Sequence, residues 1–347
     1  MYGLYFLISF FLSVILTYFC IKLAKRYNIV DIPNDRKIHK EPVPYLGGIA
    51  IFLSFIITVL IGLKLSPFFN LMKDMQGLLI SGTIIFLLGL LDDIKGTNAV
   101  LKFLVQIVAA LILVKFGYII DRITNPFGGS LIFPYWLSII ITVFWVIGII
   151  NAINLLDGLD GLASGVIGIS SLFVFIIAIL YHNIAVSHIS VILIGAIGGF
   201  LIFNFPPAKI FMGDTGSMFL GFIFSILAIL GNRKSAVAIN LLIPIVLLSI
   251  PIIDTFLAII RRANKKKNIF QADKEHIHHR LLYLGIPYRK VIILIYFICL
   301  YLGCISLLSI RLPKEFIFIL LLVVGINIII GLYILKLVED HVKISKK

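Results

Sequence analysis

Charged residues are scarce in this sequence of 347 residues. They make up 13% of the chain, 61% of the residues are hydrophobic, and the mean hydropathy is +1.14. Soluble domains carry about twice that share of charge, so the composition excludes an ordinary soluble domain. It predicts a polytopic membrane protein.

Cysteine is also rare, because Cys20, Cys299 and Cys304 are the only three. They lack the spacing to histidine that metal sites show, and they need not form a disulfide. Each lies in an apolar stretch, which is typical of a packing residue. The apolar run at residues 3–21 has neither a preceding basic region nor a cleavage site, so we expect it to stay as the first span.

Long apolar stretches fill most of the chain and leave little room for a separate soluble domain. A bilayer core needs about 20 apolar residues per helix. Eleven stretches meet this need, so we predict one all-α membrane domain over residues 1–347 with about eleven spans. These spans are 3–24, 46–63, 77–91, 99–116, 135–151, 162–181, 187–203, 215–230, 236–260, 290–310 and 315–337.

The basic residues between the spans predict the orientation. With the N-terminus outside and the C-terminus in the cytoplasm, the inner segments carry more than twice as many lysines and arginines as the outer ones. We therefore interpret the net charge of +14 as a topology signal rather than as a nucleic-acid surface.

The polar motifs all fall on the cytoplasmic side of this topology. This asymmetry predicts one composite site at the inner face, with a substrate drawn from the cytoplasm. The motifs occupy residues 31–48, 90–96, 151–165, 203–217 and 273–282.

The motif at 151–165 interrupts the apolar chain with four polar residues at a spacing of three: Asn151, Asn154, Asp157 and Asp160. If the segment is helical, these residues share one face. Such a face suits a metal ion, or the edge of a nucleobase and its ribose. The alternative, a helix cap, explains one aspartate but not four polar groups at this spacing.

Three more aspartates stand out. Asp92 and Asp93 end an apolar span as an adjacent pair, and their repulsion favours a bound cation; the alternative is a helix-end charge pair in the headgroup region. Asp214 lies in a glycine-rich turn, where it either caps a helix or binds Mg²⁺. Asp254 lies inside the ninth predicted span, where pairing with a neighbouring helix is as plausible as a functional role, so we leave it outside the site.

The remaining motifs are cationic or aromatic. His276, His278 and His279 precede Arg280, and this group fits anion binding at least as well as zinc, so we favour phosphate recognition. Lys40 belongs to a basic loop that either grips a diphosphate or only sets the topology. Phe211 could stack on a base or anchor in the membrane interface.

Together and in order, five motifs resemble those of the polyprenyl-phosphate N-acetylhexosamine-1-phosphate transferases, over residues 31 to about 285. The resemblance implies transfer of GlcNAc-1-phosphate from UDP-GlcNAc to undecaprenyl phosphate, with release of UMP, at the start of envelope glycan synthesis. The sister branch transfers phospho-MurNAc-pentapeptide. The HIHHR sequence and the eleven spans favour the first branch. The five motifs are HKEPVPYLGG, LLDDIKG, NAINLLDGLDGLASG, IFNFPPAKIFMGDTGS and DKEHIHHRLL.

The resemblance also implies roles for single residues. Asp214 would hold Mg²⁺, or Mn²⁺ in its place; Asn154, Asp157 and Phe211 would lie around the uridine; Asn204 and the histidines would lie near the phosphates. Asp92 and Asp93 match the catalytic pair. We predict the metal ligand Asp214, the catalytic residues Asp92, Asp93, Asp160 and His279, and the substrate-binding residues Lys40, Asn151, Asn154, Asp157, Asn204, Phe211, His276, His278 and Arg280.

The expected partners follow from this reading: UDP-GlcNAc, undecaprenyl phosphate and membrane lipids, but no nucleic acid, in the plasma membrane of a bacterium. A homodimer is compatible with it. Either a direct attack by the lipid phosphate or a covalent aspartyl route fits the residues. The alternative from another class is a cation-coupled transporter, which should carry its ionisable residues near mid-membrane rather than at one face.

Overall fold

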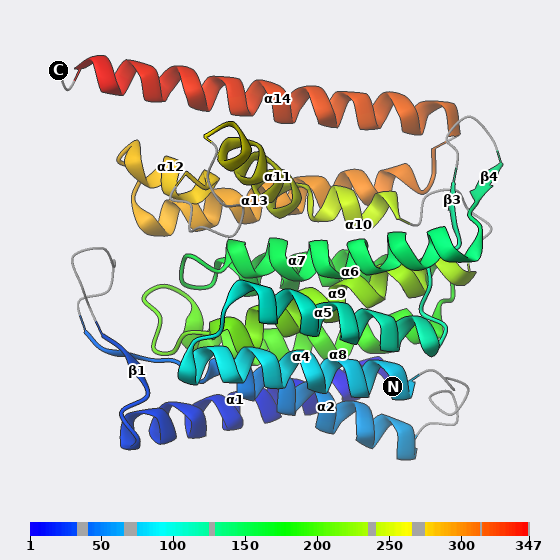
Figure 1. Ribbon diagram of the computed structural model, residues 1–347, viewed down its shortest axis with the longest axis vertical. Coiled ribbons are helices and arrows are strands. Elements are labelled where there is room, and N and C mark those ends of the chain that lie inside the picture. The colour runs from blue at the N-terminus through cyan, green and yellow to red at the C-terminus, as the bar shows by residue number, and fades with distance from the viewer. Residues whose placement is uncertain are drawn as a thin grey trace.

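The computed structural model describes residues 1–32, 41–65, 75–124, 129–234, 241–265, 275–312 and 314–345. Long helices run side by side along a common direction, and two short hairpins lie at opposite ends of the bundle (Figure 1). The prediction of an all-α polytopic membrane protein is confirmed. The number of crossings and the side on which each terminus lies remain predictions.

Within the described ranges, nine helices are long and apolar enough to cross a membrane. A tenth helix, α5 (Ala99–Lys115), has 17 residues and coincides with the span expected at 99–116. The nine are α1 (Tyr2–Arg26), α2 (Gly47–Leu65), α4 (Met75–Lys95), α6 (Tyr135–Leu156), α7 (Leu162–Leu180), α8 (Ile184–Asn204), α9 (Gly213–Lys234), α13 (Tyr288–Ser309) and α14 (Lys314–Ser345).

The span expected at 236–260 takes a different form, because its described part is two helices, α10 (Leu242–Leu247) and α11 (Ser249–Asn264). Pro251 has no backbone N–H to continue the hydrogen bonds of α10, but it is tolerated in the first turn of a new helix. A single helix over this stretch was therefore a wrong expectation. A further short helix, α12 (Ile277–Tyr283), follows.

The two hairpins are antiparallel. Strands β1 (Val30–Asp31) and β2 (Val43–Pro44) pair Val30 with Pro44, and strands β3 (Arg122–Thr124) and β4 (Ser130–Ile132) pair Arg122 with Ile132. The β1–β2 hairpin, the α6–α7 and α8–α9 connections and α12 gather at one end of the bundle (Figure 1). All the polar motifs with described residues therefore meet at that end.

Helix α9 forms the centre of the bundle, and 94% of the residues in its apolar stretch are buried. Its residues are apolar on every face, as expected for a helix surrounded by others, and it packs against α2, α4 and α6. A Cβ on Gly89 of α4 would lie 2.5 Å from the Cα of Thr215, so glycine permits α4 to approach the start of α9 closely. This contact brings the end of α4 to Asp214.

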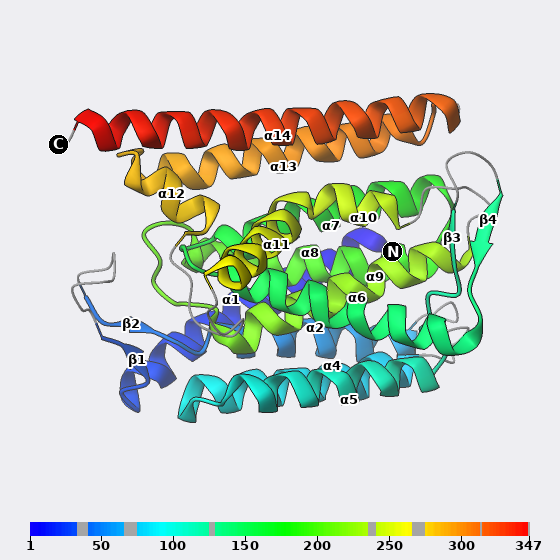
Figure 2. The ribbon, with the colours of Figure 1, turned by 45° about the horizontal axis from the view of Figure 1, so that its top comes forward.

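Helix α14 shows the opposite pattern, because only 6% of the residues in its apolar stretch are buried. It lies at the edge of the molecule alongside α13 (Figure 2). Its apolar side chains, such as Ile319, Leu322 and Ile329, are exposed. An exposed apolar helix of this length is suited to contact with lipid.

Candidate active site

The site begins where α4 ends beside the start of α9. Asp93 Oδ1 accepts a hydrogen bond from the backbone N–H of Asp214 at 2.8 Å. Its Oδ2 accepts from the N–H and the hydroxyl of Thr215, at 3.0 and 2.5 Å. The carboxylate thus satisfies free donors at the N-terminus of α9 and complements the helix dipole. In the structure, the predicted catalytic Asp93 fixes the backbone that carries Asp214.

Asp92, its neighbour, points toward a lysine. Lys102 Nζ of α5 lies 2.6 Å from Asp92 Oδ2 and 2.6 Å from Asp214 Oδ2. Asp92 Oδ1 accepts hydrogen bonds from the N–H and hydroxyl of Thr97, at 2.7 and 2.5 Å. The adjacent aspartates therefore differ in their contacts, since Asp93 binds the N-terminus of α9, whereas Asp92 binds Thr97 and a cation shared with Asp214.

Sequence reasoning gave no role to Lys102, which fell inside the expected span 99–116. A signal was available, because a single charged residue within an apolar stretch is a functional candidate. The sequence could not reveal that α5 packs beside α4 and α6, so that Lys102 reaches Asp92 and also Asp214 at the start of α9.

The two asparagines of α6 serve different contacts. Asn154 Nδ2 donates to Asp214 Oδ1 and to Ser217 Oγ, both at 2.9 Å. Asn151 Nδ2 donates to Gln106 Oε1 at 2.7 Å and to the carbonyl of Ile147 at 2.8 Å. Asn154 therefore belongs to the carboxylate cluster. Asn151 was predicted to bind substrate, but its amide joins α6 to α5 and does not line the cavity described next.

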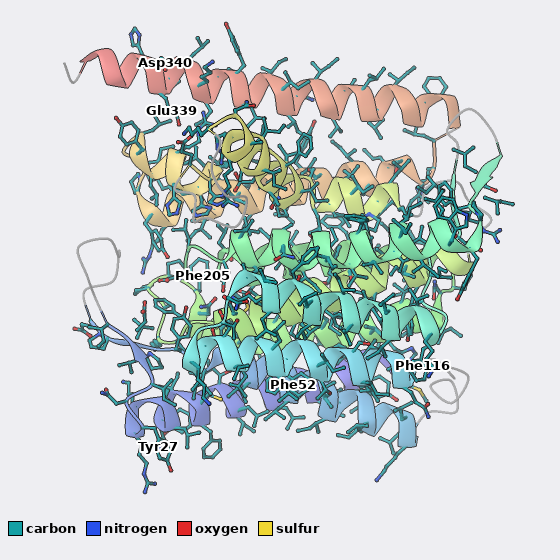
Figure 3. The ribbon with its side chains drawn as sticks, in the orientation of Figure 1. Tyr27, Phe52, Phe116, Phe205, Glu339 and Asp340 are labelled. Carbon is teal, nitrogen blue, oxygen red and sulfur yellow. The ribbon has the colours of Figure 1, made fainter. Side chains whose placement is uncertain are left out.

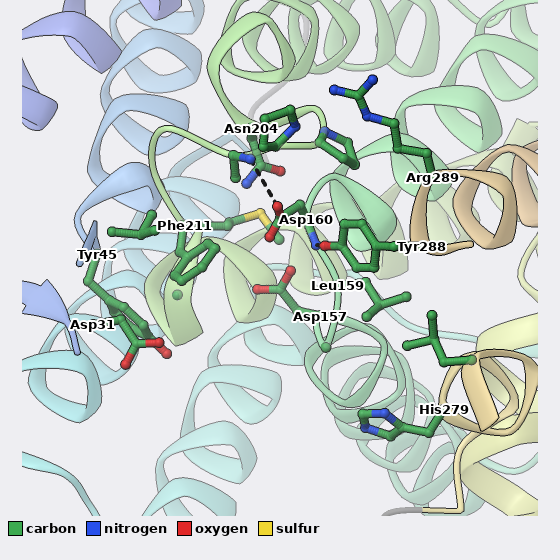
Figure 4. A pocket seen from close by; sticks show the side chains of 18 residues that line it. Asp31, Tyr45, Asp157, Leu159, Asp160, Asn204, Phe211, His279, Tyr288 and Arg289 are labelled. Carbon is green, nitrogen blue, oxygen red and sulfur yellow. Dashed lines mark hydrogen bonds between the residues drawn. The ribbon is translucent and has the colours of Figure 1, made fainter. Parts of the chain in front are cut away.

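A cavity of about 570 Å³ opens beside this cluster. In the view of Figure 4, the carboxylates of Asp157 and Asp160 lie between the rings of Phe211 and Tyr288. Five predicted site residues line it: Asp157, Asp160, Asn204, Phe211 and His279. Lining residues that sequence reasoning missed include Asp31, Tyr45, Tyr288 and Arg289.

The polar face expected along 151–160 is interrupted. Helix α6 ends at Leu156, and Asp157 to Gly161 form a turn in which Gly161 has a φ of +72°. Glycine adopts this left-handed conformation without a steric cost. Asp157 and Asp160 therefore enter the cavity from a turn, and the prediction that they continue the helical face of the asparagines was wrong.

Asn204, at the end of α8, holds this turn in place. Its Oδ1 accepts from the N–H of Gly161 and from Ser164 Oγ, both at 3.0 Å, and its Nδ2 donates to the carbonyl of Ile210 at 2.9 Å. Asp160 Oδ2 accepts from the N–H of Ala208 at 2.9 Å. The α6–α7 turn and the α8–α9 loop are thus tied together around the cavity.

The first hairpin shapes the opposite wall. The N–H of Phe211 donates to the carbonyl of Pro44 at 2.8 Å, and the N–H of Gly47 donates back to the carbonyl of Phe211 at 3.0 Å. The rings of Tyr45 and Phe211 meet edge to face, with centroids 6.1 Å apart. An aromatic wall of this kind offers a flat apolar surface for a planar ligand group.

Four acidic side chains lie close together at the site. Burial raises the pKa of Asp157 well above its usual range, and the nearby carboxylates of Asp214, Asp93 and Asp160 raise it further. The same surroundings raise the pKa of Tyr45, where burial is again the main cause. Crowded carboxylates of this kind favour a bound cation.

The three histidines occupy different positions. His276 Nδ1 lies 3.0 Å from Asp254 Oδ2, and both side chains are buried. His278 is 1% exposed and packs on Gly158; among the described residues its ring nitrogens have no hydrogen-bond partner. Burial lowers the pKa of His278 to about 3, so the ring is neutral. Of these three predicted residues, His279 lines the cavity.

Arg280, also predicted to bind substrate, does not line the cavity. Arg280 pairs with Glu339 of α14, at 2.7 and 2.8 Å. Lys40 lies outside the described residues. Asp254, which sequence reasoning left out of the site, is the buried partner of His276 and also accepts from the N–H of Ile277 at 3.0 Å.

A divalent cation fits the carboxylate cluster. Among the residues that the structure describes, no group of three or more acidic, histidine or cysteine side chains forms a ready metal cage. Mg²⁺ does not require one, because it is usually held by one or two carboxylates together with water and phosphate oxygens. Asp92 and Asp214 already share one cation, the ammonium of Lys102, so both carboxylates reach a common point.

Comparison with known proteins gives consistent results. Residues 75–232 match the model of glycosyl transferase family 4. A probable undecaprenyl-phosphate N-acetylglucosaminyl 1-phosphate transferase of Bacillus subtilis is 39% identical over 84% of this chain and 80% of its own length. A decaprenyl-phosphate N-acetylglucosaminephosphotransferase of Mycobacterium tuberculosis is 35% identical over 82% of this chain and 77% of its own.

Fold and site together define a membrane-embedded protein whose acidic, aromatic-walled pocket opens at one end of a helical bundle. An undecaprenyl-phosphate alpha-N-acetylglucosaminyl 1-phosphate transferase of Haemophilus influenzae is also similar, at 31% identity over 86% of this chain and 84% of its own. The chain belongs to glycosyl transferase family 4.

Proposed function

We propose that this protein transfers GlcNAc-1-phosphate from UDP-GlcNAc to undecaprenyl phosphate, which yields undecaprenyl-diphospho-GlcNAc and UMP. The observation that carries the proposal is the carboxylate cluster of Asp92, Asp214 and Lys102 beside a cavity of about 570 Å³. The names of the similar proteins from B. subtilis and H. influenzae describe this acceptor and this transferred group.

The cavity suits a nucleotide sugar. Its volume lies in the range of about 300–1,000 Å³ that is usual for small-molecule sites. Phe211, Tyr45 and Tyr288 supply aromatic surface for a base, and Asp157 and Asp160 supply acceptors for the N–H of a base or the hydroxyls of a ribose.

The reaction brings negatively charged groups together. An oxygen of the lipid phosphate attacks the β-phosphorus of UDP-GlcNAc, the bond from that phosphorus to the bridging oxygen breaks, and UMP leaves with that oxygen. Coulomb repulsion opposes this approach, so cations at the site must offset it. Lys102 supplies one such charge, 2.6 Å from each of two carboxylates.

Asp214 and Asp92 are the residues that would hold Mg²⁺. When bound, this ion neutralises phosphate oxygens and polarises the leaving group. Asp93 fixes the backbone of Asp214 and Asn154 donates to Asp214 Oδ1, so both act by orienting that carboxylate. Asp92 borders the same point, where it orients the acceptor phosphate or takes its proton.

We also propose that the site faces the cytoplasm of a bacterial plasma membrane. This follows from the basic residues of the inner segments and from the gathering of the motifs at one end of the bundle (Figure 1). It matches the cytoplasmic supply of nucleotide sugars.

The direct test is an assay of UMP release by the purified full chain with Mg²⁺ and undecaprenyl phosphate. We expect UMP from UDP-GlcNAc and little from UDP-MurNAc-pentapeptide. Decaprenyl phosphate serves as a second acceptor, because the M. tuberculosis protein is named for it. Release from the pentapeptide donor alone would assign the sister reaction, and no release from either would overturn the proposal.

A further inference from the structure

Helix α12 borders the pocket but lies outside the main bundle. It has seven residues and carries His279 and Leu282, which line the cavity, and His278, which packs on Gly158. A helix this short is not stable by itself, so contacts with other elements must hold it in place.

One anchor of α12 lies at its start. Asp254 of α11 accepts the N–H of Ile277 at 3.0 Å and lies 3.0 Å from Nδ1 of His276. Asp254 is 4% exposed, so this anchor is protected from water. It fixes the start of the helix, while Leu281 and Leu282 further along pack against the hydrophobic core.

The second anchor is the pair of Arg280 and Glu339. Arg280 Nε donates to Glu339 Oε1 at 2.7 Å, and its Nη2 donates to Oε2 at 2.8 Å. Both bonds of the guanidinium fork are made, which restricts orientation as well as distance. The side chains are 19% and 14% exposed, so water and salt weaken this pair less than a pair on the surface.

Glu339 belongs to α14, the helix at the edge of the molecule. Figure 3 shows Glu339 on the side of α14 that faces the rest of the molecule, and Asp340 on the far side. Asp340 is exposed. Only 6% of the apolar stretch of α14 is buried, and the pair with Arg280 links this exposed helix to α12, which lines the pocket.

We propose that Glu339 is a positioning residue of the transferase site. Through Arg280 it holds α12 in the orientation that places His279 and Leu282 against the donor pocket. The inference rests on the proposed function. It gives the C-terminal helix a part in catalysis, and it gives Arg280 a contact within the protein in place of the predicted contact with substrate.

A double-mutant cycle tests the proposal with Glu339→Gln, Arg280→Gln and the double variant, and with Asp340→Asn as the matched control. Loss of a half-buried charge pair should lower kcat/KM for UDP-GlcNAc about tenfold. Most of this loss should appear in KM, because α12 lines the donor pocket. Glu339 acts through Arg280, so the double variant should be no worse than Arg280→Gln alone. Asp340→Asn should match the wild type.

Hydrogen exchange separates positioning from a general loss of stability. In Glu339→Gln we expect faster exchange of the backbone amides of α12 and unchanged exchange in α9. Equal acceleration in both helices would overturn the proposal, as would a Glu339→Gln variant as active as Asp340→Asn, or losses that multiply in the double variant. A wild-type protein that releases no UMP from UDP-GlcNAc contradicts the proposed function instead.

Discussion

The carboxylate cluster and the α12 side of the pocket are built in different ways. The cluster lies where four long helices, α4, α5, α6 and α9, converge, and α9 is the most buried of the nine candidate membrane spans in the described part of the chain. Helix α12 has seven residues, packs beside α13 and makes polar contacts with Asp254 and with Glu339. The packed core thus holds the charges of the proposed chemistry, whereas part of the donor pocket is lined by a short helix that polar contacts help to hold.

The largest effect is expected from removing the carboxylate at the centre of the cluster. Asp214→Ala leaves Lys102 and Asn154 without a shared partner, and we expect UMP release to fall about 1,000-fold or more. Asp121→Ala is the matched control, because Asp121 lies at the opposite end of the bundle beside Arg122. An Asp214→Ala enzyme that turns over like the control would remove Asp214 from the site.

Removing the cation should have the next largest effect. Lys102→Met takes away the charge shared by Asp92 and Asp214, and we expect a fall in kcat of about 100-fold. Lys102→Arg should restore part of it. Lys115→Met, an exposed position at the other end of the same helix, provides the control. Equal kcat in the two methionine variants would show that Lys102 takes no part in the reaction.

Substitutions of the adjacent Asp92 and Asp93 should differ in their effects, one lowering activity and the other lowering stability. Asp93→Ala removes the cap of α9 and should cost about 1 kcal/mol of stability. This cost lowers the unfolding temperature. Asp92→Asn should abolish UMP release with little change in that temperature, because an asparagine still offers an oxygen to Thr97 and loses the charge that faces Lys102. Thermal unfolding and activity measured on both variants check this; the reverse pattern would exchange the two roles.

The smallest effect concerns His278. Its pKa in the folded protein is lowered to about 3, so on acidification the unfolded chain takes up the proton first. Stability from this residue is complete above the ordinary histidine pKa of 6.5 and is lost as pH falls toward 3. We therefore expect His278→Asn to reduce the drop in unfolding temperature between about pH 7 and about pH 5. His182→Asn, at an exposed position, should leave the drop unchanged.

The sequence was sufficient for the features that depend on composition and order. Long apolar stretches predicted a helical membrane protein, and motifs at the ends of those stretches predicted a site at one end of the bundle. Asp157, Asp160, Asn204, Phe211 and His279 do line one cavity. Loops at the same end of a helical bundle lie near one another. The positions of the motifs between the spans were therefore enough to predict that their residues share one site.

The sequence was insufficient where a role depends on which helices are neighbours. Lys102 belongs to an apolar span in the sequence, but α5 packs beside α4 and α6, and this places Lys102 between Asp92 and Asp214. Tyr288 and Arg289 fell in the segment just before the span expected at 290–310 and were given no role in the site, yet they line the pocket. Asn151, His276 and Arg280 looked free to bind substrate, but partners distant in the sequence, Gln106, Asp254 and Glu339, bind their polar groups.

The most direct test is a structure of the full chain with UDP-GlcNAc and Mn²⁺, in which anomalous scattering locates the metal. We expect Mn²⁺ bound by Asp214 at the diphosphate, with the uracil in the cavity lined by Phe211 and Asp160. A nucleotide bound elsewhere, or a metal distant from Asp214, would contradict the convergence of these motifs on one reaction centre.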